Sequence, residues 1–176
     1  VSNCLSDIDA LAFGNAPLVV PESRHRVLPF IKLSYVYHIL SLDQDANSNS
    51  VLLGALQSVL YQIKKMLLHV ESGLGIRLKE LHVTGWISNR PDMMQFLADL
   101  LQLSIVSHKQ ANTSVIGLAG LMGGGQGFFK GGVDMYSLNK VDRTYVPVLD
   151  PLTSYTHYQR WESCFQLLAA RDPQFL

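Results

Sequence analysis

The residues best placed for ligand chemistry stand at a strand-to-helix corner in the middle of the chain. Gly85 follows the short apolar run 81–83, and Pro91 stands where a helix commonly has its first residue. Ser88 or Asn89 is the expected N-cap of that helix. Such a corner presents unpaired backbone N–H groups, which can hold a phosphate or a nucleotide. The same pattern also builds α/β cores that bind nothing, so both interpretations stay open here.

A second corner is expected just before Gly117. Apolar residues 103–106 predict another short strand, and residues 113–122 predict a helix rich in small side chains. Small residues let a helix approach a strand or a bound base closely, although close packing alone is the commoner cause. The glycine run 123–127 fits neither GxxxxGK[ST] nor GxGxxG, and we interpret it as a helix end and a turn.

No residue spacing in the chain is typical of a catalytic or metal centre. HExxH, GxSxG and CxxC are absent from the sequence, and two cysteines, Cys4 and Cys164, predict neither a disulfide framework nor a metal cluster. Asp92 and Asp99 share one face of the expected helix, but no neighbouring residue indicates raised acidity. We therefore predict no catalytic and no metal-ligating residue.

Composition limits the classes of function. The chain has 176 residues, which fits one domain or a domain with a tail, and 48% of them are hydrophobic, which suffices for a core. A formal net charge of +0 gives no case for electrostatic binding of nucleic acid. We find neither an apolar run of about 18 residues nor a signal sequence, so no membrane association and a cytoplasmic location are expected. The chain opens on Val1, from which we expect a fragment of a longer protein.

Hydrophobic periodicity predicts the elements that position the two corners. Helices are expected over residues 5–13, 51–70, 91–101, 113–122 and 154–170. Strands are expected over residues 18–20, 81–83 and 103–106. Residues 27–42 fit either a strand or a buried loop, residues 43–50 look like an exposed loop with Ser50 as an N-cap, and residues 133–147 look irregular. Strands alternating with helices indicate the α/β class.

The order and the residue sequences of several segments resemble the C-terminal domain of the FGGY carbohydrate kinases, and within that family the glycerol kinases. The family's "GIRLKELRVDGG" corresponds to GIRLKELHVTG at 75–85, "LMQF-x-ADhL" to MMQFLADLL at 93–101, and "TALGAA" to SVIGLA at 114–119. The long helix at 57–67 and a closing helix with Tyr158 and Trp161 also match. The resemblance is collinear from about residue 51 to 168, and residues 1–50 match weakly.

The resemblance implies a fold and a function. The fold is part of an actin-like, ribonuclease-H-like ATPase domain, with a mixed sheet and flanking helices. Residues 1–50 would lead into it, and residues 51–172 would form its core and closing helix. The complete enzyme would transfer a phosphoryl group from ATP, with Mg²⁺, to a polyol hydroxyl, and this chain would be its C-terminal, nucleotide-binding half. The catalytic residues would lie in an N-terminal kinase domain that this chain lacks.

Carried over residue by residue, the family's nucleotide contacts fall on Gly85, Trp86, Asn89, Arg90 and Gly117. The family's second corner glycine is Trp86 here, and an indole either narrows the pocket or stacks on adenine. The family's asparagine falls on Arg90, with Asn89 as a neighbour that could substitute for it. A catalytically degenerate relative acting as a binding or scaffold module, and an unrelated α/β domain, stay open as alternatives. Uncovered apolar surface on an isolated half-domain also predicts a possible homo-oligomer.

Overall fold

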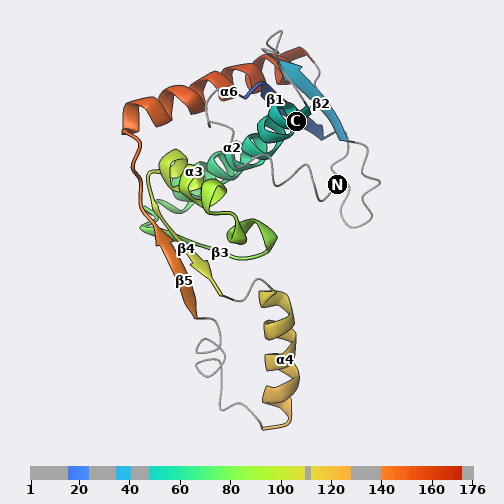
Figure 1. Cartoon of the computed structure of the whole chain (residues 1–176), viewed down its shortest axis with the longest axis vertical. Helices are drawn as coiled ribbons and strands as arrows, with labels where there is room; N and C mark the ends of the chain where they lie inside the picture. The colour runs from blue at the N-terminus through green and yellow to red at the C-terminus, as the bar shows by residue number, and fades with distance from the viewer. Residues whose placement is uncertain (1–15, 24–34, 41–47, 110–111, 128–139, 172–176) are drawn as a thin grey trace. The chain divides into compact units, whose positions relative to one another are not determined.

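The computed structural model describes residues 16–23, 35–40, 48–109, 112–127 and 140–171 of the chain (Figure 1). The expected helix over residues 5–13 lies outside these described ranges. Contacts divide the chain into two compact units, residues 1–75 with 152–176 and residues 76–151. Each unit has its own sheet.

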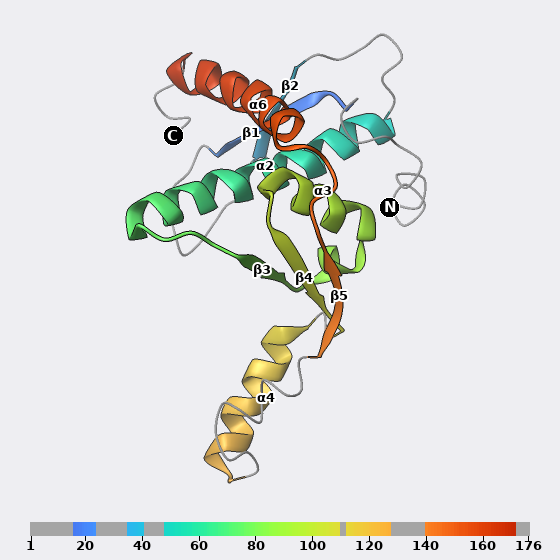
Figure 2. The same cartoon turned by 90° about the vertical axis from the view of Figure 1, so that its left-hand side faces the viewer.

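The described part of the first unit combines a two-stranded sheet with two long helices. Strands β1 (Leu18–Ser23) and β2 (Tyr35–Leu40) pair antiparallel. Helix α2 (Ser48–Leu74) packs against β1, and α6 (Pro151–Arg171) completes the unit (Figure 2). The undecided stretch 27–42 therefore contains a strand in its described part, and the strand expected at 18–20 continues to Ser23.

Helix α2 confirms the expected long helix but has different ends. Ser50 lies inside the helix, so its prediction as the N-cap was wrong. Serine is a modest helix former that is tolerated in a first turn, where backbone N–H groups need no intrahelical partner. Gly75, with φ of 65°, follows the last helical residue in the left-handed conformation that favours glycine. By length and composition alone α2 could cross a membrane, a weak indication because buried core helices pass the same test.

Gly54 explains how closely α2 approaches the strand layer. A Cβ atom at this position would collide with the backbone carbonyl of Pro17 and touch the side chain of Val19. Helix α2 can therefore pack this closely against β1 and the residue before it only because residue 54 has no side chain. This requirement is a tertiary one, and periodicity along the helix does not reveal it.

An aromatic cluster joins α2 to α6 within the first unit. The Trp161 ring lies 5.5 Å from Tyr61 of α2 and 5.3 Å from Phe165 of its own helix, centroid to centroid. Its indole Nε1 donates a 3.1 Å hydrogen bond to the Val19 carbonyl of β1. Burial raises the pKa of Tyr61 to about 12, opposed by the charge of Arg160. Trp161, fully buried, therefore ties three elements together.

An ion pair borders this cluster and makes its stability depend on pH. Lys65 of α2 donates to Glu162 of α6 at 3.0 Å, and Gln166 and Tyr158 also donate to that carboxylate. Burial alone would raise the pKa of Glu162, but these hydrogen bonds and the Lys65 charge outweigh burial and lower it. The pair's stabilisation is therefore present above the unfolded-state pKa of about 4.3 and is lost as pH falls through the folded-state value.

Replacing Glu162 by glutamine is expected to lower the free energy of unfolding by about 0.5–1 kcal/mol at pH 7. The difference from the wild type should shrink as pH falls below about 4, where both proteins carry a neutral group. Urea unfolding at several pH values measures it. Asp142→Asn, at an exposed carboxylate, is the matched control. A deficit that stays constant down to pH 3 would contradict the ion-pair explanation.

The second unit is a three-stranded mixed sheet with helices. Strands β3 (Glu80–Val83) and β4 (Ser104–His108) are parallel, and β5 (Val141–Tyr145) pairs antiparallel with β4. The chain passes from β3 through the short 3₁₀ helix η2 (Trp86–Asn89) into α3 (Pro91–Leu101). Helix α4 (Thr113–Gly125) follows β4, and α3 packs against β4 and β5. The α/β class is thereby confirmed.

Several expected boundaries in this unit need correction. The strand predicted at 103–106 extends to His108, and β5 forms where an irregular stretch was expected. Helix α3 begins at Pro91 as predicted, but its N-cap is Arg90, and no side chain caps it. Ser88 is already used inside η2, which explains why it does not cap α3. Helix α4 runs three residues past the expected end, and Gly127, with φ of 77°, forms the turn after it.

One face of α3 holds the segment that links β5 to α6. The Asp99 carboxylate accepts hydrogen bonds from the backbone N–H groups of Val148 at 2.6 Å and Leu149 at 3.0 Å. Gln95 and Gln102 donate to the carbonyls of Val146 and Leu149. The carboxylate of Asp99, considered above as a possible acid, therefore binds the backbone of this linking segment.

Candidate functional site

The first corner is a tight, ordered turn at the carboxyl end of β3. Gly85 has φ of 96° and ψ of −178°, a conformation almost restricted to glycine. Both the Oγ and the backbone N–H of Ser88 donate to the Gly85 carbonyl, at 2.7 and 3.2 Å. Trp86 keeps 63% of its surface exposed, and Asn89 is exposed as well. The strand-to-helix corner predicted from the sequence is therefore present, with a 3₁₀ turn between strand and helix.

Gly85→Ala is expected to lower the free energy of unfolding by about 1–3 kcal/mol. No atom outside the adjoining residues lies within 4 Å of where the new Cβ would stand, so the cost comes from the backbone conformation alone. Urea unfolding followed by circular dichroism checks it. Gly73→Ala, a helical glycine with the same open surroundings but no positive φ, should not destabilise the protein. Equal losses in both variants would refute the backbone explanation.

Arg90 also belongs to the predicted site, and its guanidinium forms an ion pair with a carboxylate. Its Nε lies 3.2 Å from Asp92 Oδ1 and its Nη2 lies 3.0 Å from Asp92 Oδ2, a bidentate ion pair. Both side chains are largely buried, at 19% and 23% exposure. The pair neutralises the guanidinium and fixes it beside the start of α3. Asn89, in contrast, makes no side-chain hydrogen bond within the described part of the chain.

The second corner meets the first through two hydroxyl groups. Asn112 precedes the first turn of α4, and the Thr113 hydroxyl donates to the Thr84 hydroxyl at 3.1 Å. The end of β3 and the start of α4 are thereby brought together, although the two threonines are 29 positions apart in the sequence. Gly117 lies one turn further along α4, and no atom beyond its chain neighbours and its own helix backbone lies within 4 Å of where a Cβ would stand. The structure therefore joins the two corners through Thr84, directly after β3, and Thr113, the first residue of α4.

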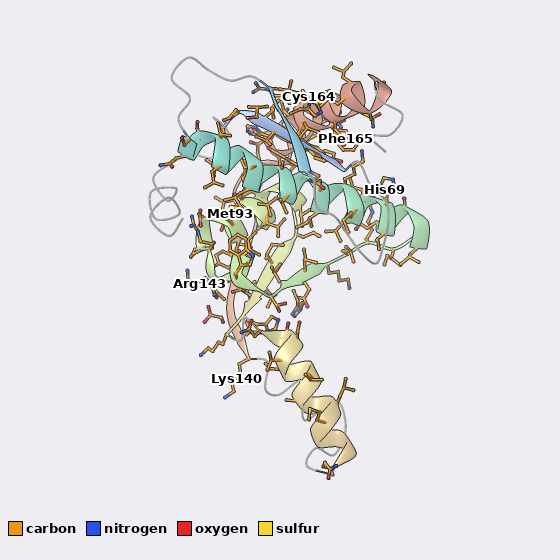
Figure 3. All side chains as sticks on the ribbon, turned by 90° about the vertical axis from the view of Figure 1, so that its right-hand side faces the viewer. His69, Met93, Lys140, Arg143, Cys164 and Phe165 are labelled. Atoms are coloured by element: carbon orange, nitrogen blue, oxygen red, sulfur yellow. The ribbon has the colours of Figure 1, made fainter. Side chains whose placement is uncertain are left out.

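Basic residues that the sequence analysis did not assign to the site occupy the same edge of the sheet. β3 and β4 are parallel, so their carboxyl ends share one edge, where antiparallel β5 begins. Lys109 donates its backbone N–H to the Lys140 carbonyl at 3.0 Å, and both lysine side chains are exposed. Figure 3 shows Lys140 and Arg143 at β5. Open α/β sheets commonly bind ligands at this edge. The two lysines are 31 positions apart in the sequence, so no local pattern indicated that they would meet.

Two histidines lie next to this edge, joined by a hydrogen bond. His82 Nδ1 and His108 Nε2 are 2.8 Å apart, and Glu80 Oε1 lies 3.0 Å from the other nitrogen of His82. One ring must donate and the other accept, because an N–H···N bond holds a single proton. Among the described residues, no group of three or more His, Cys, Asp or Glu side chains is placed to hold a metal ion.

Comparison with solved structures identifies the fold. Glycerol kinase from Plasmodium falciparum, solved with ADP, superposes with a TM-score of 0.73 over 94% of this chain and 33% of its own, at 16% identity. Gluconate kinase from Lactobacillus acidophilus gives 0.71 over 99% of this chain and 36% of its own, at 12% identity. Xylulose kinase from Rhodospirillum rubrum gives 0.69 over 96% and 34%, at 16% identity. The architecture is thus the actin-like α/β fold of sugar kinases.

Sequence comparison narrows this class to a family. The C-terminal domain of the FGGY family of carbohydrate kinases matches residues 5–123. Glycerol kinases are similar over 124 residues, at 32% identity for Haemophilus influenzae and 30% for Shewanella amazonensis. The chain belongs to the FGGY family of carbohydrate kinases, as part of its C-terminal domain. The match covers 70% of this chain but 25% of either relative, so the chain spans about a quarter of their length.

Proposed function

We propose that this chain forms the nucleotide-binding part of a glycerol-kinase-like carbohydrate kinase. In the complete enzyme, ATP donates its γ-phosphoryl group to a polyol hydroxyl, and an N-terminal kinase domain contributes the catalytic residues. As part of the proposal, residues 1–50 lead into the domain, residues 51–172 form its core and closing helix, and the protein works in the cytoplasm. Gly85, Trp86, Asn89, Arg90 and Gly117 form the candidate nucleotide site.

The joined corners carry the proposal. The Thr84–Thr113 hydrogen bond holds the end of β3 against the start of a 13-residue helix, whose first N–H groups favour an anion. No atom outside the adjoining residues lies within 4 Å of where a Cβ of Gly85 would stand, and this backbone is proposed to approach the nucleotide. Lys109 and Lys140 add positive charge at the same edge, where phosphate groups would lie. Arg90 is proposed to shape the corner through Asp92 while keeping its guanidinium neutralised.

Mg²⁺ enters the proposal only together with the nucleotide. Among the described residues no cluster of three or more His, Cys, Asp or Glu side chains is placed to hold a metal ion, and we propose no magnesium ion held by this part of the chain alone. A Mg²⁺ ion that accompanies ATP or ADP would take its ligands from phosphate oxygens and water.

Binding of ADP to the 176-residue chain, measured by equilibrium dialysis with Mg²⁺ present, tests the proposal. We expect saturable binding with a dissociation constant below about 1 mM, which corresponds to a binding free energy of about −4 kcal/mol and requires only a few contacts. Lys109→Gln should weaken ADP binding but leave adenosine binding unchanged, because only ADP carries phosphates. Absence of ADP binding at millimolar concentration by a protein that remains folded would contradict the proposal.

A second candidate is a catalytically degenerate relative that serves as a binding or scaffold module. The engagement of Arg90 by Asp92 and the indole at position 86 favour it. Helix α4 also favours the scaffold function, because it has no charged residue and four of its large apolar side chains are 60–78% exposed. These are Val115, Leu118, Leu121 and Met122. The scaffold function predicts a folded chain without ADP binding that self-associates in sedimentation analysis, and a monomer would contradict it.

A further inference from the structure

Two imidazole rings meet on one face of the three-stranded sheet. His82 of β3 pairs with Val106 of β4, and successive side chains of a strand alternate between faces, so His82 and His108 lie on the same face. Nδ1 of His82 is 2.8 Å from Nε2 of His108, and the ring centroids are 5.1 Å apart. His108 is buried and His82 is half-exposed, so one of the two rings is open to solvent.

A carboxylate orients the exposed ring of this pair. Glu80, two residues earlier on β3, has its Oε1 3.0 Å from Nε2 of His82. An ionised carboxylate only accepts hydrogen bonds, so Nε2 of a neutral His82 carries the proton and its Nδ1 presents a lone pair toward His108. Metal sites in proteins use the same carboxylate–imidazole contact to fix the tautomer and the orientation of a ligating histidine.

We propose that His82 and His108 together bind a divalent transition-metal ion, for which zinc is the probe. Imidazole nitrogen suits zinc, copper and nickel, whereas Mg²⁺ prefers oxygen ligands. Two Zn–N bonds of about 2.0–2.1 Å at a tetrahedral ion set the nitrogens about 3.3 Å apart, so the rings need to separate by only about 0.5 Å. Zinc takes the place of the bridging proton, which His108 then carries on Nδ1. Water fills the other positions, because no group of three or more His, Cys, Asp or Glu in the described part of the chain is placed to hold the ion.

Isothermal titration calorimetry of the 176-residue chain with zinc chloride, in a buffer without nucleotide, tests the pair. We expect one saturable binding event at micromolar zinc and none with magnesium chloride. His82→Gln and His108→Gln should each weaken zinc binding by at least about tenfold, because loss of a ligand costs no less than loss of its outer-shell partner. His69→Gln, at an exposed histidine of α2 (Figure 3), is the matched control without effect.

Nuclear magnetic resonance of the imidazole nitrogens identifies the ligands. Zinc should shift the resonances of His82 Nδ1 and His108 Nε2. Glu80→Ala should weaken zinc binding about tenfold and, before zinc is added, should change the ratio of the two His82 tautomers. Undiminished zinc binding by His82→Gln, an equal loss in His69→Gln, equal binding of magnesium, or no zinc binding by the folded wild type would each overturn the assignment. None of these results bears on the proposed nucleotide site, which is tested with ADP.

Discussion

Trp161→Ala is expected to lower the free energy of unfolding by about 3–5 kcal/mol, the usual cost of deleting a buried aromatic side chain. The side chain has no exposed surface and lies within 5.5 Å of Tyr61 and Phe165, centroid to centroid. Its removal opens a cavity between α2 and α6 and leaves the Val19 carbonyl without its donor. Urea unfolding monitored by circular dichroism measures the loss. Domains of this size are stable by only about 5–15 kcal/mol, so the soluble yield should fall too.

Two companion variants separate the contributions of the indole. Trp161→Phe keeps an aromatic ring in the cluster but cannot donate to Val19, so it should lose about 1–3 kcal/mol. Trp86→Ala removes an exposed indole and should change stability by less than about 0.5 kcal/mol. An unchanged urea midpoint in Trp161→Ala would show that the cluster does not support the first unit.

The helices could be predicted because their signal is local. Apolar residues three and four positions apart mark the buried face of α3, where Met93, Met94 and Leu97 are all buried. The ends of helices were less predictable. Whether Ser50 or Arg90 caps a helix depends on which backbone groups need partners in the folded chain, and residue type alone does not decide that.

Strand β5 illustrates the opposite case. Among its residues Val141–Tyr145 only Tyr145 is buried, so the strand carries no alternating apolar pattern. It exists because its backbone pairs with β4, more than 30 residues earlier in the chain. The same strand β4 includes His108, two residues past the strand end expected from the sequence, and His108 bonds His82 across the sheet.

The candidate site was predictable to the extent that it depends on neighbouring residues. A strand, a glycine and a proline in order were sufficient to indicate the corner at Gly85. The Thr84–Thr113 bond and the lysines at the same edge depend on parallel pairing of β3 with β4, which no single segment encodes. The family resemblance supplied Gly117 by position, and the structure adds the hydroxyl contact that joins its helix to the first corner.

Asp99→Ala is expected to lower the free energy of unfolding by about 2–3 kcal/mol. One carboxylate oxygen accepts the backbone N–H groups of Val148 and Leu149 and the side-chain amide of Gln95. Hydrogen bonds to a charged acceptor contribute about 1.5–3 kcal/mol each when buried, and partial solvent access reduces this sum. Alanine leaves the linker between β5 and α6 without that acceptor. Urea unfolding measures the loss, and cleavage by a protease should increase near residues 146–149.

Asp99→Asn and Asp92→Ala show whether the acceptor or the charge matters. Asparagine keeps a carbonyl acceptor at position 99, so it should recover about half of the stability that alanine loses. Asp92→Ala removes a carboxylate from the same helix without touching the linker, and its protease sensitivity near residues 146–149 should equal that of the wild type. If Asp99→Ala and Asp92→Ala open the linker equally, the carboxylate of Asp99 is not what holds it. If only Asp99→Ala does so, the aspartate of the family's "ADhL" segment has a structural task, because it holds the linker to the closing helix on α3.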